Sequence, residues 1–518
     1  MHARTTTWLA TDRASPASKR RTLVLLFAAT LLPRFVMAWL IPTICPDGTT
    51  YVAVAKWIEE QGTYYRRDLG VNLYPLILAA LHKTGLGWPL AAKLWGVVCA
   101  SLAVLPLYGW VRRMFDDRIA LYAGLLYAFH SKLIEWSPEM VREQTFWLLA
   151  ALVWYAAWRA AHEGRVVWFA ALAALLPAAV LTRFEGLFLY VIPLAWSLAA
   201  AINVPERRRR LLTLTTASLA AAPAAGLLYH FVRNGASIEQ FAYSLPWERA
   251  RELLARVSGS GPSVVNEHFG ARPNPLSPAI AQMVGQTVVR GFTPLYALLL
   301  LVGLVVEGRR TFSVDRLPVL SVTLLTLAGI WTHAWYAGLI SSRYLLPLVI
   351  ASSGTAAVGF LTTVRSLSNF AAKRRPALHP AWAAAAITTV VILAGCIDAF
   401  KTNYAGRLET ARLGTWIRAQ YGSGLRIYGG DAQLELLAYY AEADCFRIPP
   451  YRTPEVAATH AQDIRPDIIL LSAPLPAETR RSLQDFAAKW GYTTTLGPCT
   501  YRPVEILSSA ESRTTSRR

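Results

Sequence analysis

A carboxylate stands just after the first long apolar stretch of the chain. The apolar residues near 22–42 end a few positions before Asp47, in the segment "CPDGTTYVAVAKW", and Tyr51 follows four residues later. A carboxylate at that point can accept the proton of an attacking hydroxyl group, which is general-base chemistry. Asp is also a favoured N-cap residue, and the residues after it have helical spacing. Taken alone, the segment favours a capped helix and leaves the general base open.

A second polar group lies at residues 130–149, in "HSKLIEWSPEMVREQTFWLL". Pro138 suits the first turn of a helix, and in such a helix Glu139 and Glu143 would share one face. The functional interpretation is a polar wall beside Asp47, with Glu143 the deepest residue. The alternative is compensation of the helix dipole by early carboxylates, together with interfacial snorkelling. The same segment also contains His130, Lys132, Glu135 and Arg142. Together with Glu143, three residues are candidates to support the site or to contact the acceptor: Lys132, Glu139 and Tyr51.

Two arginines interrupt later apolar segments. Arg183 lies in "LTRFEGLFL", and Arg343 precedes Tyr344 in "ISSRYLLPL". The forked guanidinium group is suited to binding a phosphate. The alternatives are an ion pair with Glu185 for the first arginine and membrane anchoring for the second. Three further residues have less specific roles: Arg66 and Arg67 could contact anionic lipid heads or a substrate diphosphate, and we interpret His333 as a packing or interface histidine.

The composition indicates a polytopic membrane protein. Of the 518 residues, 54% are hydrophobic and only 16% are charged, whereas soluble chains carry about 25% charged residues. The formal net charge is +20, but the basic residues form short clusters between apolar segments, so we expect no nucleic-acid partner. Five cysteines do not make a disulfide framework. Cys445 and Cys499 could pair in an oxidising compartment.

The apolar segments predict about eleven transmembrane helices, since one span needs about 20 apolar residues. Short basic loops such as "VRRMFDDR" and "ERRRR" alternate with less basic ones. Because cytoplasmic loops hold the excess of Lys and Arg, residues 1–21 are predicted to be cytoplasmic and the C-terminal part to lie outside. The expected spans are 22–42, 88–111, 118–136, 144–161, 165–182, 184–202, 211–232, 292–306, 316–338, 342–363 and 381–400.

The transmembrane region is predicted to span residues 22–400. This topology places three long segments of the chain on the extracytoplasmic side. The first, 43–87, contains two segments that are expected to form helices in the membrane interface. The second, 233–291, contains one amphipathic basic helix and a Pro-rich loop. The third, 401–505, alternates strand-like and helix-like segments, which predicts a small soluble α/β domain. Residues 506–518 are expected to be a disordered tail.

The order of these segments resembles that of the GT-C glycosyltransferases of family 39. This group includes protein O-mannosyltransferases and aminoarabinose transferases of lipid A. The resemblance covers about residues 20–365 and rests on five segments: "PDGTTYVAVAKWIEEQGTYY", "NLYPLILAAL", "SPEMVREQTFWLL", "LTRFEG" and "SRYLLPL". It implies an all-α GT-C membrane domain, carrying here a C-terminal α/β domain.

The resemblance also implies a reaction. Such enzymes take a sugar from a polyprenyl-phosphate carrier in the outer leaflet, here of a bacterial inner membrane. They transfer it with inversion to a lipid, glycan or protein acceptor. Asp47 occupies the position of the catalytic base, and Arg183 and Arg343 are the best matches for residues that hold the leaving phosphate. Many relatives have Asp-Glu at the first-loop motif, whereas this chain has Gly48 as the second residue. Because the second carboxylate is missing from this loop, the need for a divalent metal ion stays open. Our hypothesis is that Glu143 supplies the missing carboxylate.

Two other classes of membrane protein remain as alternatives. A transporter or flippase of lipid-linked sugars usually has two related halves and binding groups near the bilayer midplane. This chain has no internal repeat, and its ionisable residues are expected at one membrane edge. A non-catalytic scaffold would leave the membrane-edge carboxylate unexplained. An oligosaccharide ligase is a close neighbour of the preferred class.

Overall fold

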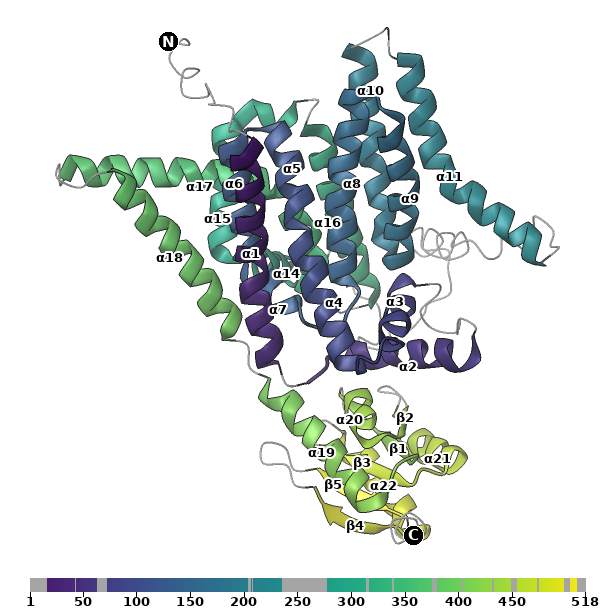
Figure 1. The fold of residues 1–518 in the computed structure, drawn as a ribbon. Coiled ribbons are helices and arrows are strands. Elements are labelled where there is room, and N and C mark those ends of the chain that lie inside the picture. The colour runs from purple at the N-terminus through teal and green to yellow at the C-terminus, as the bar shows by residue number, and fades with distance from the viewer. Residues whose placement is uncertain are drawn as a thin grey trace.

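A helical membrane region and a small soluble domain make up the computed structural model (Figure 1). It describes residues 16–41, 43–62, 72–203, 206, 208–234, 277–313, 316–337, 340–374, 380–401, 404–430, 433–448, 454–472, 475–497 and 504–509. Several predictions lie outside these residues: Arg66, Arg67, Cys499, the amphipathic helix within 233–291 and most of the C-terminal tail.

Long helices form the membrane region, and their bounds follow the predicted apolar segments. Tryptophans tie three of them together: Trp154 of α8 lies 5.4 Å from Trp110 of α5 and 5.5 Å from Trp196 of α10, measured between ring centroids. The helices are α1 (Pro16–Leu40), α4 (Trp88–Leu102), α5 (Val104–Met114), α6 (Asp117–Ala128), α8 (Glu143–Glu163), α9 (Val166–Thr182), α10 (Val191–Asn203), α11 (Arg208–Asn234), α15 (Pro294–Glu307), α16 (Leu317–Ala337), α17 (Leu346–Arg374) and α18 (Pro380–Phe400).

The number of membrane crossings stays a prediction. Among the described residues, six helices are long and apolar enough to span a bilayer, or up to seven if a bent pair counts as one. That pair is α14 (Pro278–Phe292) and α15, which meet at 91° around Thr293, a non-glycine residue with φ of 59°. The predicted span 118–136 is divided in the structure into α6 and the short α7 (Ser131–Trp136).

The first predicted loop contains two helices, α2 (Pro46–Gln61) and α3 (Leu73–His82). Helix α2 begins with Pro46, which suits the first turn. It ends at Gly62, whose φ of 65° is left-handed and favours glycine. Tyr51 of α2 packs edge-on against Tyr74 of α3, with ring centroids 5.1 Å apart. The two expected helices are therefore present and pack against each other.

The soluble domain is α/β, as predicted. Its strands are β1 (Arg426–Gly429), β2 (Asp444–Arg447), β3 (Ile468–Leu471), β4 (Thr493–Leu496) and β5 (Glu505–Ser508). They form one sheet in the order β2-β1-β3-β5-β4. The pairs β1–β2 and β1–β3 are parallel, and β5 is antiparallel to both neighbours. The predicted boundary at residue 505 is wrong, because β5 crosses it and lies within the sheet.

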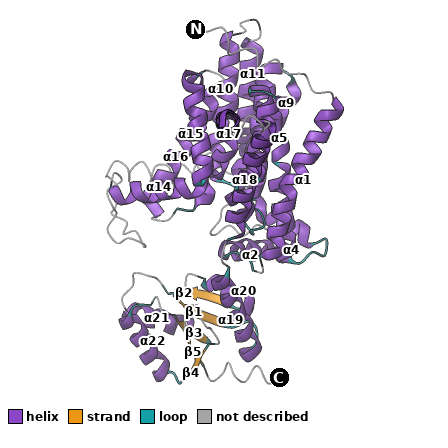
Figure 2. Cartoon of the chain, turned by 90° about the vertical axis from the view of Figure 1, so that its left-hand side faces the viewer, coloured by secondary structure: helices purple, strands orange, loops and turns teal. Residues whose placement is uncertain are grey.

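Helices cover both faces of this sheet (Figure 2). One face packs against α19 (Ala405–Tyr421) and α20 (Leu434–Ala441). The other packs against α21 (Pro454–Ile464) and α22 (Ala477–Lys489). Alternating buried residues such as Ile427 and Tyr428 of β1 point to opposite faces. The sequence did not predict α19, the first helix after the membrane region.

Candidate active site

Five charged residues from distant parts of the sequence meet at the ends of helices. Asp47 lies in the first turn of α2, and Glu143 is the first residue of α8. Arg183 follows the last residue of α9, and Glu185 belongs to the 3-10 turn η2 (Phe184–Tyr190). Arg343 belongs to the 3-10 turn η6 (Ser342–Leu345), directly before α17. Because helix ends leave backbone groups unsatisfied, such positions suit polar side chains.

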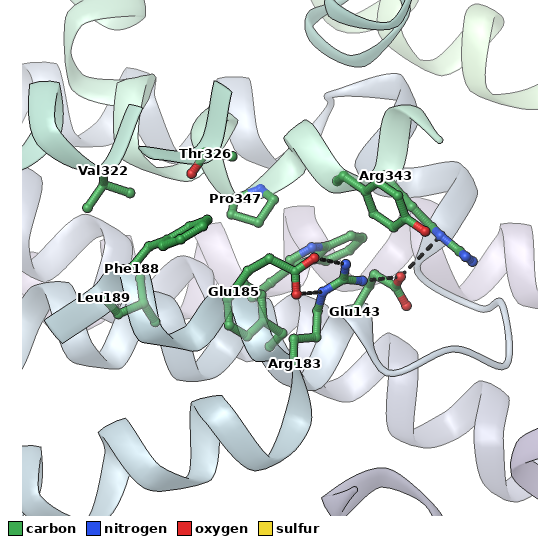
Figure 3. Close-up of a pocket in the computed structure, with 12 residues that line it drawn as sticks. Glu143, Arg183, Glu185, Phe188, Leu189, Val322, Thr326, Arg343 and Pro347 are labelled. Carbon is green, nitrogen blue, oxygen red and sulfur yellow. Dashed lines mark hydrogen bonds and ion pairs between the residues drawn. The ribbon is translucent and has the colours of Figure 1, made fainter. Parts of the chain in front are cut away.

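These five residues form one network of alternating charge, which we call the ion-pair network. Arg343 pairs with Asp47 through Nη2, and its Nε lies 3.1 Å from Oε1 of Glu143. Arg183 contacts the same Glu143 oxygen through Nη1. It donates to both oxygens of Glu185, at 2.5 Å from Nη2 and 3.2 Å from Nε. Figure 3 shows the part of the network from Glu185 to Arg343.

Burial differs sharply along the ion-pair network. The side chain of Glu143 is 3% exposed and that of Arg183 is 6% exposed, whereas Asp47 is 47% exposed. A buried charge is tolerated only when it is paired and hydrogen-bonded. The two arginines neutralise the central carboxylate from both sides. The network therefore has a fixed buried centre and leaves the Asp47 carboxylate accessible.

Aromatic rings hold the two guanidinium groups in place. The Tyr344 ring centroid lies 4.9 Å from the guanidinium carbon of Arg183 and 5.4 Å from that of Arg343. Trp136 lies 5.3 Å from the Arg343 guanidinium. Such cation–π contacts favour positive charge near the ring face. His333 packs edge-on against Tyr344 with centroids 5.4 Å apart, in agreement with its interpretation as a packing residue. The sequence analysis did not single out Trp136.

An amphipathic pocket adjoins this network (Figure 3). Its cavity volume is about 20 Å³, room for about one water molecule, so a larger ligand needs side chains to move apart. Glu143, Arg183 and Arg343 line one part. Apolar side chains line much of the rest, including Phe146, Trp147, Phe188, Leu189, Val322 and Pro347. A pocket of this kind suits a ligand with an anionic group and an apolar portion.

Three other predicted site residues lie outside the ion-pair network. Lys132 pairs with Glu135 at 2.6 Å. Helix α8 begins at Glu143 and not near Pro138, so the prediction that Glu139 and Glu143 share a helix face is wrong. Glu139 instead pairs at 2.6 Å with Arg407 of α19, a residue that the sequence analysis did not consider.

Tyr51 is the third of these residues. Its side chain is buried, with 6% of its surface exposed. Burial raises the pKa of Tyr51 well above its usual value, so the phenol stays neutral. Its edge-on contact with Tyr74 gives it a packing role between α2 and α3. A direct contact with an acceptor stays a prediction.

The backbone at Gly48, the residue after Asp47, leaves no space for a side chain and therefore none for a second carboxylate. A Cβ atom added to Gly48 would lie 2.8 Å from the Cβ of Met140, which is closer than real Cβ contacts. The loop before α8 therefore packs directly onto the first turn of α2. This contact gives a steric reason for the Gly48 departure noted in the sequence.

The acidic residues of the site are engaged by arginines. Asp47, Glu143 and Glu185 each pair with Arg183 or Arg343. Within the described part of the chain, no group of three or more His, Cys, Asp or Glu residues is arranged to hold a metal ion. Metal dependence stays an open prediction.

Comparison with known families gives one match. Residues 75–230 match the family described as dolichyl-phosphate-mannose-protein mannosyltransferase. This segment includes Glu143 and Arg183 but neither Asp47 nor Arg343. No curated protein matches the chain.

Solved structures resemble this chain over most of its length. ArnT from Cupriavidus metallidurans bound to undecaprenyl phosphate has a TM-score of 0.58 and 15% sequence identity, covering 95% of this chain and 98% of that one. The oligosaccharyltransferase of Archaeoglobus fulgidus in the apo form has a TM-score of 0.54 and 12% identity, covering 92% and 73%. Both are GT-C glycosyltransferases, so the fold is GT-C. With the family match, this confirms the predicted resemblance and the enzyme class.

Proposed function

We propose that this protein, a membrane glycosyltransferase with the GT-C fold, transfers a sugar from a polyprenyl-phosphate carrier to an acceptor hydroxyl group, with inversion. The observation that carries the proposal is the accessible Asp47 carboxylate paired with Arg343 beside an amphipathic pocket. The donor combines the two features that such a site can bind, namely a phosphate and a long apolar chain. The ArnT structure contains undecaprenyl phosphate, a molecule of this type.

In the proposed reaction, Asp47 is the general base. It accepts the acceptor hydroxyl proton while the hydroxyl oxygen forms a bond to the anomeric carbon. The bond between the anomeric carbon and the phosphate oxygen breaks, and polyprenyl phosphate leaves with the bonding electrons. Attack from the face opposite the leaving phosphate inverts the anomeric carbon. Asp47 pairs with Arg343 through Oδ2, so Oδ1 is the oxygen proposed to accept the proton.

The two arginines have different parts in this proposal. Arg343 is the more exposed, at 14%, and pairs with the accessible carboxylate. It is therefore the first candidate to bind the leaving phosphate, where positive charge stabilises the developing negative charge. Arg183 is engaged by Glu143 and by both oxygens of Glu185. Its proposed role is to hold Glu143 and, when the donor binds, to add positive charge behind Arg343.

The proposed location of the reaction is the extracytoplasmic edge of a bacterial inner membrane. The positive-inside rule supports an internal N-terminus and an external soluble domain. The ion-pair network then lies at the outer edge, beside the soluble domain. The proposed acceptor is a lipid, glycan or protein on that side.

The first test measures the release of undecaprenyl phosphate. The purified protein is placed in lipid nanodiscs with undecaprenyl-phosphate-linked sugars and extracted envelope lipids or glycoproteins. Mass spectrometry should detect undecaprenyl phosphate together with a glycosylated acceptor. Cells that lack the gene should accumulate the lipid-linked sugar, which would identify the donor. Absence of any accumulation and of any transfer would refute the proposal.

The second test concerns the phosphate site. The variant Arg343→Ala should bind undecaprenyl phosphate about tenfold to hundredfold more weakly, because a hydrogen bond to a charged group contributes about 1.5–3 kcal/mol. Its control is Arg309→Ala, which removes an exposed arginine from the turn η4 (Gly308–Phe312). Equal affinity in both variants would remove Arg343 from the phosphate site.

A further inference from the structure

The soluble domain packs directly onto the helix that carries Asp47. Leu436 of α20 is fully buried. It belongs to a hydrophobic cluster with Tyr51, Val52 and Ala55 of α2. Figure 1 shows α20 next to α2, between the membrane region and the sheet. The inner face of α2 is therefore completed by a residue that lies far along the sequence.

A second contact joins the soluble domain to the loop before α8. Arg407 lies in the first turn of α19, and its Nη1 donates to Oε1 of Glu139 at 2.6 Å. The Glu139 side chain is 3% exposed, whereas that of Arg407 is 23% exposed. Burial raises the pKa of the Glu139 carboxyl, and Arg407 opposes this shift. Loss of Arg407 would leave a buried carboxylate without its cationic partner, which is costly.

The loop that holds Glu139 also fixes the start of α2. Met140 contacts Gly48 closely, as described above. The Cys45 thiol, directly before α2, donates to the Met140 carbonyl oxygen at 3.5 Å. A continuous series of contacts therefore runs from Arg407 through Glu139 and Met140 to the first turn of α2. Asp47 lies in that turn.

We propose that Arg407 and Leu436 are positioning residues, through which the soluble domain holds the first turn of α2 so that Asp47 stays in register with Arg343. This inference rests on the proposed role of Asp47 as the base. Neither residue reaches the ion-pair network, so both act through α2 and its neighbouring loop. The soluble domain thereby becomes part of the catalytic apparatus.

A small displacement of Asp47 would be enough to slow the reaction. A misplacement of about 1 Å can reduce a rate about a hundredfold. The Asp47 side chain is half exposed, so little packing fixes it directly. Its position depends on the backbone of α2, whose buried residues include Tyr51, Val52 and Ala55. These residues face α3 and α20, and the second of these helices belongs to the soluble domain.

The kinetic experiment uses the full-length protein. Arg407→Ala and Leu436→Ala should each lower kcat about tenfold to hundredfold, while KM for the lipid-linked donor changes less than about threefold. The matched control is Arg418→Ala, also on α19, which removes an ion pair with Glu442 at 2.9 Å between half-exposed side chains. The control should keep the kcat of the unmodified protein. An unchanged kcat in both Arg407→Ala and Leu436→Ala would overturn the proposal.

Rescue variants separate positioning from simple loss of folding. Arg407→Lys keeps the positive charge and should recover most of the lost kcat. Arg407→Glu should reduce kcat at least as much as Arg407→Ala, and its combination with Glu139→Arg should restore kcat by reversing the pair. A lack of recovery in both rescue variants, with the soluble domain folded as judged by proteolysis, would contradict the assignment of this pair.

A measurement that does not depend on catalysis distinguishes the proposed function from the proposed positioning role. Amide hydrogen exchange in residues 46–61 should become at least about tenfold faster in Arg407→Ala and stay unchanged in Arg418→Ala. If the unmodified protein transfers no sugar, the proposed function fails, yet faster exchange would still support the contact. If transfer occurs but exchange and kcat are both unaffected by Arg407→Ala, the positioning role alone is refuted.

Discussion

Replacement of Asp47 by Asn should separate catalysis from stability. The Asp47 side chain is 47% exposed, and among the described residues its ion-pair partner is Arg343. Exposed pairs contribute about 0–1 kcal/mol to stability, and the Asn oxygen can still accept a hydrogen bond from the guanidinium group. The N-cap of α2 is Cys45 and not Asp47, so the substitution removes no capping residue. We therefore expect Asp47→Asn to shift the Tm by no more than about 4 °C.

The activity of the same variant should fall much further. A side chain that moves a proton in the transition state contributes about 10²–10⁴-fold to the rate. An amide cannot accept that proton. The initial rate of undecaprenyl phosphate release, measured by mass spectrometry at saturating donor, should therefore decrease at least about a hundredfold. Donor affinity should change little, because the apolar pocket is intact.

The control for this experiment is Glu435→Gln in the soluble domain. Glu435 is likewise part of a solvent-accessible pair, with Arg447 at 2.6 Å. The Glu435→Gln variant should lose as little stability as Asp47→Asn and should keep its full transfer activity. Normal turnover in Asp47→Asn would refute the general-base assignment. A collapse of Tm together with activity would show that the carboxylate is structural, contrary to its exposure.

Four further outcomes test other features. Glu143→Gln should cost about 3–5 kcal/mol of stability, because the buried guanidinium group of Arg183 and the partly buried one of Arg343 lose their shared carboxylate; thermal unfolding measures this. Gly48→Glu should lower transfer activity through its clash with the Cβ atom of Met140, and Met140→Gly, which removes that atom, should restore part of it. A reporter fused after Lys401 should read as external. Burial raises the pKa of the Cys445 thiol to about 11, so its alkylation should accelerate with each pH unit from 7 to 10.

Four residues of the ion-pair network could be predicted from the sequence as a group at one membrane edge. Asp47, Glu143, Arg183 and Arg343 interrupt or border apolar segments, where ionisable groups are expensive and therefore conspicuous. The fifth, Glu185, was noted only as a local partner of Arg183. The pairing itself depends on how α2, α8, α9 and α17 pack, which periodicity does not encode.

Other features depended on long-range contacts. Glu139 and Arg407 are 268 positions apart, and each has an ordinary local explanation as an interface or linker charge. Strand β5 crosses the predicted boundary between the soluble domain and the disordered tail. A strand of four residues flanked by polar sequence has too short an apolar pattern to be recognised. The sequence analysis placed the start of a span at residue 292, next to the break at Thr293, but it did not predict the helix α14 before that break.

The packing of Leu436 against Val52 also has a consequence for synthesis of the chain. Residues of α2 leave the ribosome roughly 380 positions before α20 does, which corresponds to about 20–80 seconds at about 5–20 residues per second. During that interval, the apolar face of α2 has no covering helix from the soluble domain. The membrane surface or a chaperone must protect this face, and a chain terminated before α20 would keep it exposed permanently.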